Sequence, residues 1–268
     1  MKRRSWKPSA ELAPYIERYW SGESGAGEPL PTLLPGTGHD VFFHDGAPFA
    51  SGAGRGHLLC VRTRPWRLEA AGRVAFTAIR FRAGALRHFC GVGAGELFDR
   101  CVGVEALWGR EGGRWAERIL ETPDLQTRLD LLNGQLVRWL RAGRRRDGWV
   151  DAAAARLYRG HAAGRIESVA AEMGVGRRRL ERGFRAGLGL TPKGFQRLAR
   201  FQQTVRELLL AKTASGLEAA LAHGYFDQPH FIREFEAFAQ VAPGAFLTPR
   251  NFVSHFYNPP GSAWGISS

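Results

Sequence analysis

The sequence is poor in cysteine and has no long apolar run, and both absences narrow what the chain can be. Its 268 residues include three cysteines, Cys60, Cys90 and Cys101, without a CxxC or other metal-ligand spacing. We therefore expect no disulfide framework, no metal site and a reducing compartment. The thiols are expected to be buried or incidental, and a redox-sensing pair stays open. No stretch approaches the roughly 20 apolar residues of a membrane span.

The chain also lacks the short motifs of common enzyme classes. It contains no P-loop, no G-x-S-x-G elbow and no H-E-x-x-H pair. The basic segment Met1–Trp6 is not followed by an apolar run, so we expect no signal peptide. These absences predict a cytoplasmic protein that is not an enzyme and that needs no cofactor.

Positive charge, in contrast, is abundant. The chain has 38 basic and 25 acidic residues, for a net charge of +13. Residues 1–149 hold 23 basic and 16 acidic residues and the remainder 15 and 9, so both halves share the excess. Such a chain attracts polyanions. An arginine-biased composition also fits a GC-rich genome, so charge alone does not identify a nucleic-acid partner.

Residues 166–246 are typical of two helix-turn-helix units joined by one long helix. In each unit a short alanine-containing helix ends at a glycine, Gly174 or Gly224, and a polar turn leads to a second helix. A chain that reverses within a few residues needs a positive φ, which glycine adopts at the least cost. Ala170 and Ala220 lie four residues before these glycines, where a small side chain allows close helix packing.

Proteins with such helix-turn-helix units place the second helix of a unit in the DNA major groove. One unit alone could equally be an ordinary helical hairpin, but two units fifty residues apart favour DNA binding. Each unit has an apolar set at helical spacing, although Gly183 stands where an apolar residue is normal. The first set is Val169, Met173, Val175, Leu180 and Phe184. The second set is Leu221, Tyr225, Phe231, Phe235 and Phe238.

The segment Thr191–Lys212 predicts the connecting helix. Thr191 is a suitable N-cap and Pro192 fits the first helical position, where its missing N–H costs nothing. At 1.5 Å per residue this helix spans roughly 30 Å, close to the roughly 34 Å between successive major-groove turns on one face of B-DNA. The connector would therefore place two recognition helices on one duplex. The residues expected on its polar side are Lys193, Arg197, Arg200 and Arg206.

The segment from about 160 to 250 resembles the DNA-binding domain of the AraC/XylS family of bacterial transcription regulators. The similarity is carried by Gly224-Tyr-Phe-Asp-Gln-Pro-His-Phe-Ile-Arg-Glu-Phe235 and the following Val241-Ala-Pro-Gly-Ala-Phe246. Two residues depart from the pattern. Gln240 stands where a turn glycine is usual, and Pro229 lies in the first turn of the second recognition helix, where proline is tolerated. The resemblance implies a transcription regulator with double-stranded DNA and RNA polymerase as partners.

The candidate DNA-binding residues lie on the early turns of the two recognition helices. They are Arg177, Arg178, Arg179, Glu181 and Arg182 on the first helix and Gln228, His230 and Arg233 on the second. Arginine can bind guanine bidentately and glutamine can pair with adenine. The comparison with the family places Arg178 and Arg182 nearest to base edges, although all four arginines could bind phosphate alone. Asp227 should cap the second helix, and His230 could pack against backbone instead of facing DNA.

The N-terminal half predicts a different kind of fold. Asp40–His44, His57–Thr63 and Val74–Phe81 have the β-branched and aromatic content of strands, with Asp45-Gly46 as a tight turn. Past Gly84 the pattern is helical. A leucine edge follows, which could form a dimer surface or pack on its own sheet. It consists of Leu125, Leu129, Leu132, Leu136 and Leu140.

These patterns predict an α+β protein with a mixed β-rich N-terminal domain followed by an all-α double helix-turn-helix domain. Arg141–Gly148 breaks the hydrophobic pattern and marks the boundary. We expect a sensor or dimerisation domain at 1–145, the DNA-binding domain at 146–250, beginning with a helix near Ala152–Tyr158, and a tail at 251–268.

The N-terminal half resembles, more loosely, an uncharacterised domain that precedes AraC-type DNA-binding domains. The residues that carry this are Leu12–Trp20, Leu33–Pro35 with Asp40–Phe43, and Ile79–Gly84. The resemblance implies that this half binds a small-molecule effector or forms a homodimer, although the sequence names no ligand. Its aromatic residues could line a pocket or form core. They are Tyr15, Tyr19, Trp20, Trp66, Phe76 and Phe81, with His39, Asp40, His44 or Arg80 as polar anchors.

Two other classes of protein compete with a ligand-responsive regulator. An architectural DNA-binding protein without an effector would show weak sequence preference. A DNA-repair alkyltransferase sensor can share the helix-turn-helix domain, but it needs a four-cysteine zinc site that three scattered cysteines cannot make.

Overall fold

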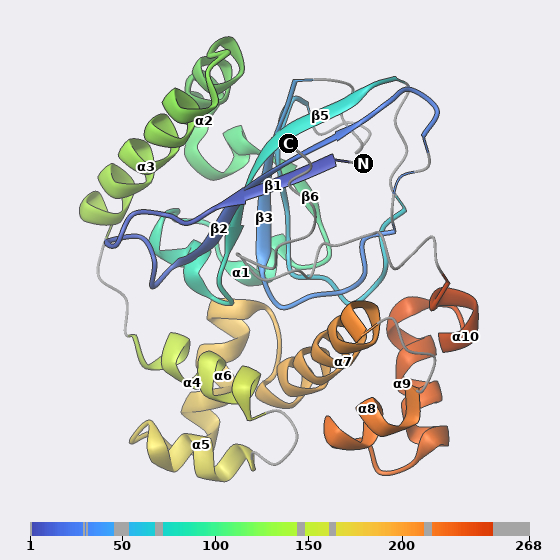
Figure 1. The fold of residues 1–268 in the computed structure, drawn as a ribbon. Helices are drawn as coiled ribbons and strands as arrows, with labels where there is room; N and C mark the ends of the chain where they lie inside the picture. Colours follow the sequence, from blue (N-terminus) through green and yellow to red (C-terminus); the bar gives the residue numbers. More distant parts are fainter. Residues whose placement is uncertain are drawn as a thin grey trace.

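The computed structural model describes residues 2–28, 30, 32–45, 54–67, 72–143, 148–160, 165–211 and 216–248. An N-terminal sheet with covering helices is followed by a helical C-terminal part, so the predicted α+β class is confirmed (Figure 1). The predicted Asp45-Gly46 turn, the boundary at 145–146 and the tail at 251–268 lie outside the described residues, in whole or in part.

Within the described residues the sheet has six strands, all paired antiparallel, in the order β1-β2-β5-β3-β4-β6. The strand bounds are β1 Lys2–Trp6, β2 Ile16–Ser24, β3 His39–His44, β4 Gly56–Leu59, β5 Val74–Phe81 and β6 Cys101–Gly103. The three predicted runs correspond to β3, β4 and β5, and β4 ends at Leu59 instead of Thr63. Sequence reasoning missed β1, β2 and β6, because the first two carry charged residues and the third has only three residues.

The helices divide into two groups. The first is η1 Ala85–His88, α1 Ala94–Leu97, α2 Val104–Glu121 and α3 Leu125–Ala142. The second is α4 Trp149–Arg159, α5 Ile166–Glu172, α6 Arg177–Leu188, α7 Pro192–Ala211, α8 Gly216–Ala222, α9 Gln228–Ala239 and α10 Pro243–Phe246. In Figure 1 α2 and α3 lie beside the sheet, whereas α4 to α10 gather at one end of the molecule, with α7 between the two helix-turn-helix units.

The predicted leucine edge of α3 packs against its own sheet. Leu129, Leu132 and Leu136 are buried in a cluster that also holds residues of β3 and β5, such as Phe43 and Ile79. Burial of these three leucines favours packing on the chain's own sheet over a dimer surface, while Leu125 and Leu140 at the ends of the edge are half-buried. The N-terminus of α3 is capped by Asp124, whose carboxylate accepts the Thr127 N–H at 2.7 Å.

The aromatic residues that could have lined a pocket are mostly core. Tyr19, Trp20, Phe76 and Phe81 are buried, while Tyr15 and Trp66 are half-buried. The proposed polar anchors are also buried, and Arg80 forms an ion pair with Asp40. These are His39, Asp40, His44 and Arg80.

Three buried histidines, His39, His44 and His57, belong to this part of the protein. The rings of His44 and His57 stack with centroids 4.9 Å apart and lie against Phe42. Burial lowers the pKa of His39 and of His44 to about 3 and the pKa of His57 to about 4. The neighbouring Arg80 charge adds to the effect at His39. All three rings are therefore neutral at neutral pH.

The cysteines are free thiols. Cys60 is buried, and Cys90 and Cys101 are partly buried. Burial raises the pKa of Cys60 and of Cys101 to about 12, which disfavours the reactive thiolate.

The C-terminal core follows the predicted apolar sets with one correction. Residues of both units and of α7 share one cluster, but Leu221 is 46% exposed, so its assignment to the core was wrong. The physical reason is that Ala219 and Ala220 occupy the inner face of α8 and leave Leu221 on the outer face. The remaining members are buried or packed against the cluster as expected.

The turns adopt the backbone geometry that the sequence predicts. Gly174 has a φ of 64° and Gly224 a φ of 84°. Gln240, at the usual glycine position, also adopts the left-handed conformation with a φ of 58° and donates its N–H to Glu236 O at 2.9 Å. Helix α9 therefore ends in the same left-handed conformation that a glycine would adopt, at a strain cost of order 1 kcal/mol for glutamine. Pro229 lies within the first turn of α9.

Gly183 has a packing reason that the sequence did not show. A Cβ built on it would lie 2.3 Å from the ring of Trp149, which comes from α4. The Trp149 side chain therefore occupies the space that an apolar residue would normally fill at this position.

The N-terminal half contacts α4 and α7 directly. The Gln202 side-chain oxygen accepts the N–H of Thr37 at 2.9 Å and its hydroxyl at 3.0 Å. The Asp151 carboxylate of α4 lies 2.8 Å from Arg87 and 2.6 Å from His88, both in η1. These contacts connect the sheet region to the helical part at two places.

Replacing Gly183 with alanine should destabilise the protein, although alanine is the better helix former. Overpacking against Trp149 should cost about 1–3 kcal/mol. The matched control is Gly134→Ala in α3, where the new methyl group meets open space and should stabilise by roughly 0.5–1 kcal/mol. Urea unfolding of both variants checks this. Equal effects of the two changes would contradict the packing account.

The buried histidines predict loss of stability in acid. Their folded pKa values lie below the ordinary 6.5, so the unfolded chain binds more protons between pH 6.5 and 4. The contribution is complete above about pH 6.5 and should fall by up to roughly 1.4 kcal/mol per pH unit for each histidine below it. Urea midpoints at constant ionic strength measure the slope. His57→Phe, which keeps a ring in the stack, should have a shallower slope than the unmodified chain.

Candidate nucleic-acid interface

The first recognition helix, α6, separates apolar and basic residues onto opposite sides. Leu180, Phe184 and Leu188 are buried at intervals of four residues. Arg178 and Arg182 are exposed on the other side, and their side chains form no hydrogen bond or ion pair within the described part of the chain. Two predicted base-reading residues are therefore available to a ligand.

The other three predicted residues of α6 already have partners. Arg177 bonds Glu167 at 2.6 Å and Glu181 at 3.1 Å. The Arg179 guanidinium lies 5.8 Å from the ring centroid of Trp149. Because exposed ion pairs contribute little, with a median of about 0–1 kcal/mol, these side chains can exchange partners.

The second recognition helix, α9, begins as predicted. Asp227 accepts the His230 N–H at 2.7 Å, and Gln228 is exposed at the first helical position. His230 Nδ1 accepts the backbone N–H of Phe226 at 3.2 Å, so the neutral ring carries its hydrogen on Nε2. The backbone contact left open for His230 is therefore present, and one ring nitrogen remains a donor. Arg233 is exposed one turn further along.

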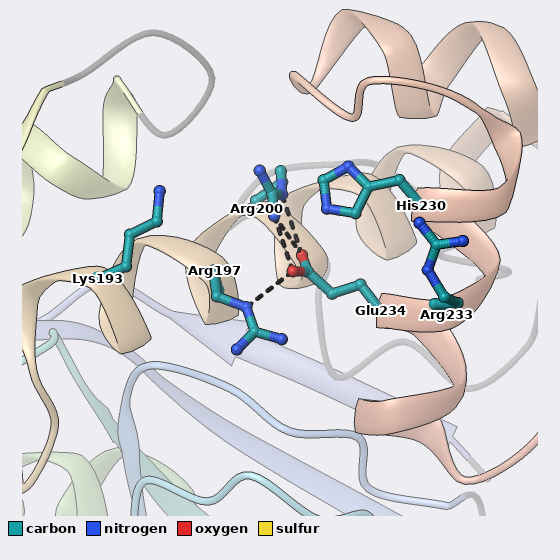
Figure 2. A pocket seen from close by; sticks show the side chains of 6 residues that line it. All are labelled: Lys193, Arg197, Arg200, His230, Arg233 and Glu234. Atoms are coloured by element: carbon teal, nitrogen blue, oxygen red, sulfur yellow. Dashed lines mark hydrogen bonds and ion pairs between the residues drawn. The ribbon is translucent and has the colours of Figure 1, made fainter.

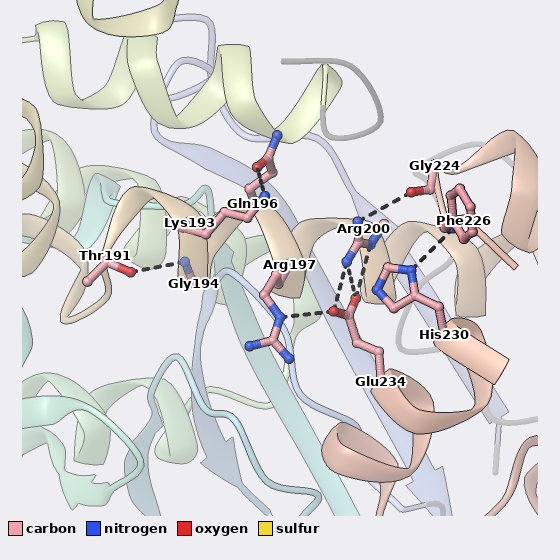
Figure 3. A network of polar contacts seen from close by, with 10 residues as sticks. All are labelled: Thr191, Lys193, Gly194, Gln196, Arg197, Arg200, Gly224, Phe226, His230 and Glu234. Atoms are coloured by element: carbon pink, nitrogen blue, oxygen red, sulfur yellow. Dashed lines mark hydrogen bonds and ion pairs between the residues drawn. The ribbon is translucent and has the colours of Figure 1, made fainter. Parts of the chain in front are cut away.

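A buried carboxylate fastens α9 to α7. Glu234 is only 3% exposed and accepts Arg197 Nε at 2.9 Å and Arg200 Nη2 at 2.8 Å (Figure 3). Arg200 also donates to Gly224 O at 3.4 Å and lies 4.5 Å from the ring centroid of Tyr225. Arg200, which was predicted on the polar side of the connector, is thus a structural residue that holds α9.

Beside this carboxylate lies a basic hollow of about 360 Å³ between α7 and α9 (Figure 2). Four cationic side chains face one carboxylate, so the lining has a net charge of +3 with His230 neutral. The lining residues are Lys193, Arg197, Arg200, His230, Arg233 and Glu234. Two of the predicted DNA-binding residues, His230 and Arg233, therefore share a surface with the connector.

Sequence reasoning missed several residues of the candidate interface. Arg185 is exposed on α6 at three residues from Arg182, a spacing that could have identified it. Lys193 and Arg197 were placed on the polar side of the connector without a role. The burial of Glu234 carried no sequence signal, because a charged residue on a recognition helix is ordinarily exposed.

Other kinds of site find no support in the described residues. Among them no group of three or more histidine, cysteine or acidic side chains is arranged to hold a metal ion. Nor do the helices described include one whose length and apolarity would carry it across a membrane.

Several solved structures resemble this chain loosely. Three are crystal structures of ToxT from Vibrio cholerae. One, at 1.65 Å resolution, has 10% sequence identity and a TM-score of 0.48, covering 85% of this chain and 97% of its own. A second, from strain O395, has 10% identity and a TM-score of 0.47, covering 85% and 96%. The third, with an unsaturated fatty acid bound, has 13% identity and a TM-score of 0.47, covering 85% and 94%.

No curated protein matches the chain. Two family models do. Residues 169–248 match a helix-turn-helix domain, and residues 4–103 match a domain of unknown function, DUF6597. The first range contains both turn glycines and both recognition helices. The chain therefore carries a helix-turn-helix domain of the AraC type behind a match to the DUF6597 domain.

Proposed function

We propose that this protein is a sequence-specific transcription regulator that contacts two successive major-groove segments of one duplex through α6 and α9. The observation that carries the proposal is the exposed pair Arg178 and Arg182 on α6, opposite its buried stripe and without an internal partner among the described residues. A helix of the length of α7 spans about 30 Å, which suits the separation of two groove segments.

Each candidate residue has a role that its surroundings support. Arg178 and Arg182 reach base edges, where each guanidinium can bind one guanine bidentately. Gln228 suits adenine, and His230 offers its Nε2 hydrogen. Arg233 lies next to the hollow and can bind either a base or a phosphate. Arg177, Arg179 and Glu181 border the groove and orient the helix through their present contacts.

The N-terminal domain, proposed as residues 1–145, regulates this binding in our account. Its contacts with α4 and α7 give it direct access to the first unit and the connector of the domain at 146–250. A small-molecule effector or a homodimer partner that alters these contacts would change how freely the recognition helices engage DNA. The proposed compartment is the cytoplasm, the proposed further partner is RNA polymerase, and no catalytic activity is proposed.

An architectural DNA-binding protein without an effector is the second candidate. The positive charge of both halves favours it, because phosphate attraction needs no sequence. It predicts weak sequence preference, whereas a regulator should bind its site at least about a thousandfold tighter than random DNA.

Base reading by Arg182 is testable with DNA that flanks the gene of this protein. Arg182→Ala should cost about 1–3 kcal/mol at the preferred site and relax preference at one base position. Arg114→Ala is the matched control. Arg114 is exposed on α2, and its replacement removes the same positive charge. Titration against the preferred and a shuffled duplex measures both. Equal weakening on the two duplexes would reassign Arg182 to the phosphates.

Control by the N-terminal domain predicts that Gln202 influences DNA binding without touching DNA. Gln202→Leu leaves the buried N–H and hydroxyl of Thr37 without their acceptor, which costs about 1–3 kcal/mol per group. We expect DNA affinity to change by more than about threefold, since 1 kcal/mol corresponds to about fivefold. The control is Gln126→Leu on the exposed surface of α3. Unchanged affinity in the Gln202 variant would contradict the mechanism.

A further inference from the structure

We propose that the basic hollow between α7 and α9 is a phosphodiester-binding site that takes one phosphate of the DNA backbone beside the bases read by α9. This inference rests on the proposed function and adds a contact to it. It concerns Lys193 and Arg197 of the connector, which lie outside both recognition helices (Figure 2).

The cations around the hollow differ in how far internal partners already engage them. Arg200 is engaged by Glu234, Gly224 O and the ring of Tyr225, and its side chain is 11% exposed. Arg197 donates to Glu234 through Nε alone within the described residues, and its guanidinium lies 5.7 Å from the ring centroid of Phe238, but its side chain is still 47% exposed. In Figure 2 its two terminal nitrogens point away from the carboxylate. Arg197 can therefore hold Glu234 and donate to a ligand at the same time.

The two outer cations of the hollow, Lys193 and Arg233, are also available. Lys193 Nζ lies 3.2 Å from Gln196 Oε1, which uses one of its three donors. Arg233 is exposed and makes no side-chain hydrogen bond or ion pair within the described part of the chain. Together with Arg197 they come from two helices and line one hollow.

The polar groups that the lining leaves for a ligand are all of one kind. Both carboxylate oxygens of Glu234 already accept arginine hydrogens, and its side chain is 3% exposed. The groups that remain, on lysine, arginine and His230 Nε2, are all donors. A ligand that fits must be an acceptor with negative charge, as a phosphodiester is.

The position of the hollow favours DNA as the source of the phosphate. His230 and Arg233 belong to α9, the helix that would lie in the groove, so a backbone strand at the groove edge passes the same surface. A free oxyanion would satisfy the same donors. The two sources differ in one respect: only a backbone phosphate has a fixed position in the DNA site.

The test compares salt dependence for Lys193→Gln and for Arg114→Gln on α2, which removes one charge from an exposed helix outside the helix-turn-helix units. Lys193→Gln should weaken binding by the same factor on the preferred and the shuffled duplex. It should also reduce the slope of log affinity against log salt by about one, since each phosphate contact contributes about 0.9. Arg114→Gln should leave the slope unchanged.

A second measurement locates the phosphate. Duplexes that carry a single uncharged methylphosphonate are scanned along the site, and one position should weaken the unmodified protein but not the Lys193 variant. One outcome overturns the phosphate site: the protein prefers its duplex over the shuffled one, but the salt slope of Lys193→Gln equals the slopes of the unmodified protein and of Arg114→Gln. Absence of any preference with a reduced Lys193 slope would refute the proposed function and leave the site standing.

Titration with inorganic phosphate separates the two sources of the anion. Saturable binding of phosphate to the unmodified protein, lost in Lys193→Gln and accompanied by a featureless methylphosphonate scan, would assign the hollow to a free oxyanion and overturn the DNA assignment. Weak or undetectable phosphate binding with one sensitive position in the scan is the expected result.

Discussion

The position of the second recognition helix depends on the buried carboxylate of Glu234. Arg197 and Arg200 lie three residues apart on α7 and would repel each other, but each donates to this one carboxylate at 2.8–2.9 Å. Burying a charge is costly unless its partners are close and its lone pairs are filled, and both conditions hold here. The interaction therefore does more to fix the direction of α9 relative to α7 than to add net stability.

The same ion pairs decide which cations are free for a ligand. The basic residues of the helical part divide into those with internal partners, such as Arg200, and those with none among the described residues, such as Arg178, Arg182 and Arg233. Net charge alone cannot make this distinction. The free arginines lie on the two recognition helices and beside the connector, whereas the engaged ones hold those helices in place. Arg200 thus has a structural role and Arg178, Arg182 and Arg233 are left for binding, whereas the half-exposed Arg197 can serve both purposes.

The sequence predicted the helical part well because its signals are local. Turn glycines, the Asp227 cap and the Thr191 cap, whose hydroxyl accepts the Gly194 N–H at 3.0 Å, act within a few residues. Contacts distant in sequence were not predictable. The edge strand β1 pairs with β2, the Trp149 ring fills the space at Gly183, and the Glu234 clamp joins helices far apart in the chain. The DNA contacts themselves stay predictions, since they depend on a partner.

In the proposed function, regulation and recognition converge on α7. Gln202, which holds the N-terminal half through Thr37, lies two residues from Arg200, which holds α9 through Glu234. A packed helix moves as a unit, so a shift of α7 that breaks the first contact also displaces the anchor of the second. The first unit is linked in a similar way, because Asp151 of α4 contacts η1 while Trp149 packs against Gly183 of α6. A change in the N-terminal half can therefore reach both recognition helices through rigid helices, without a ligand that touches either one.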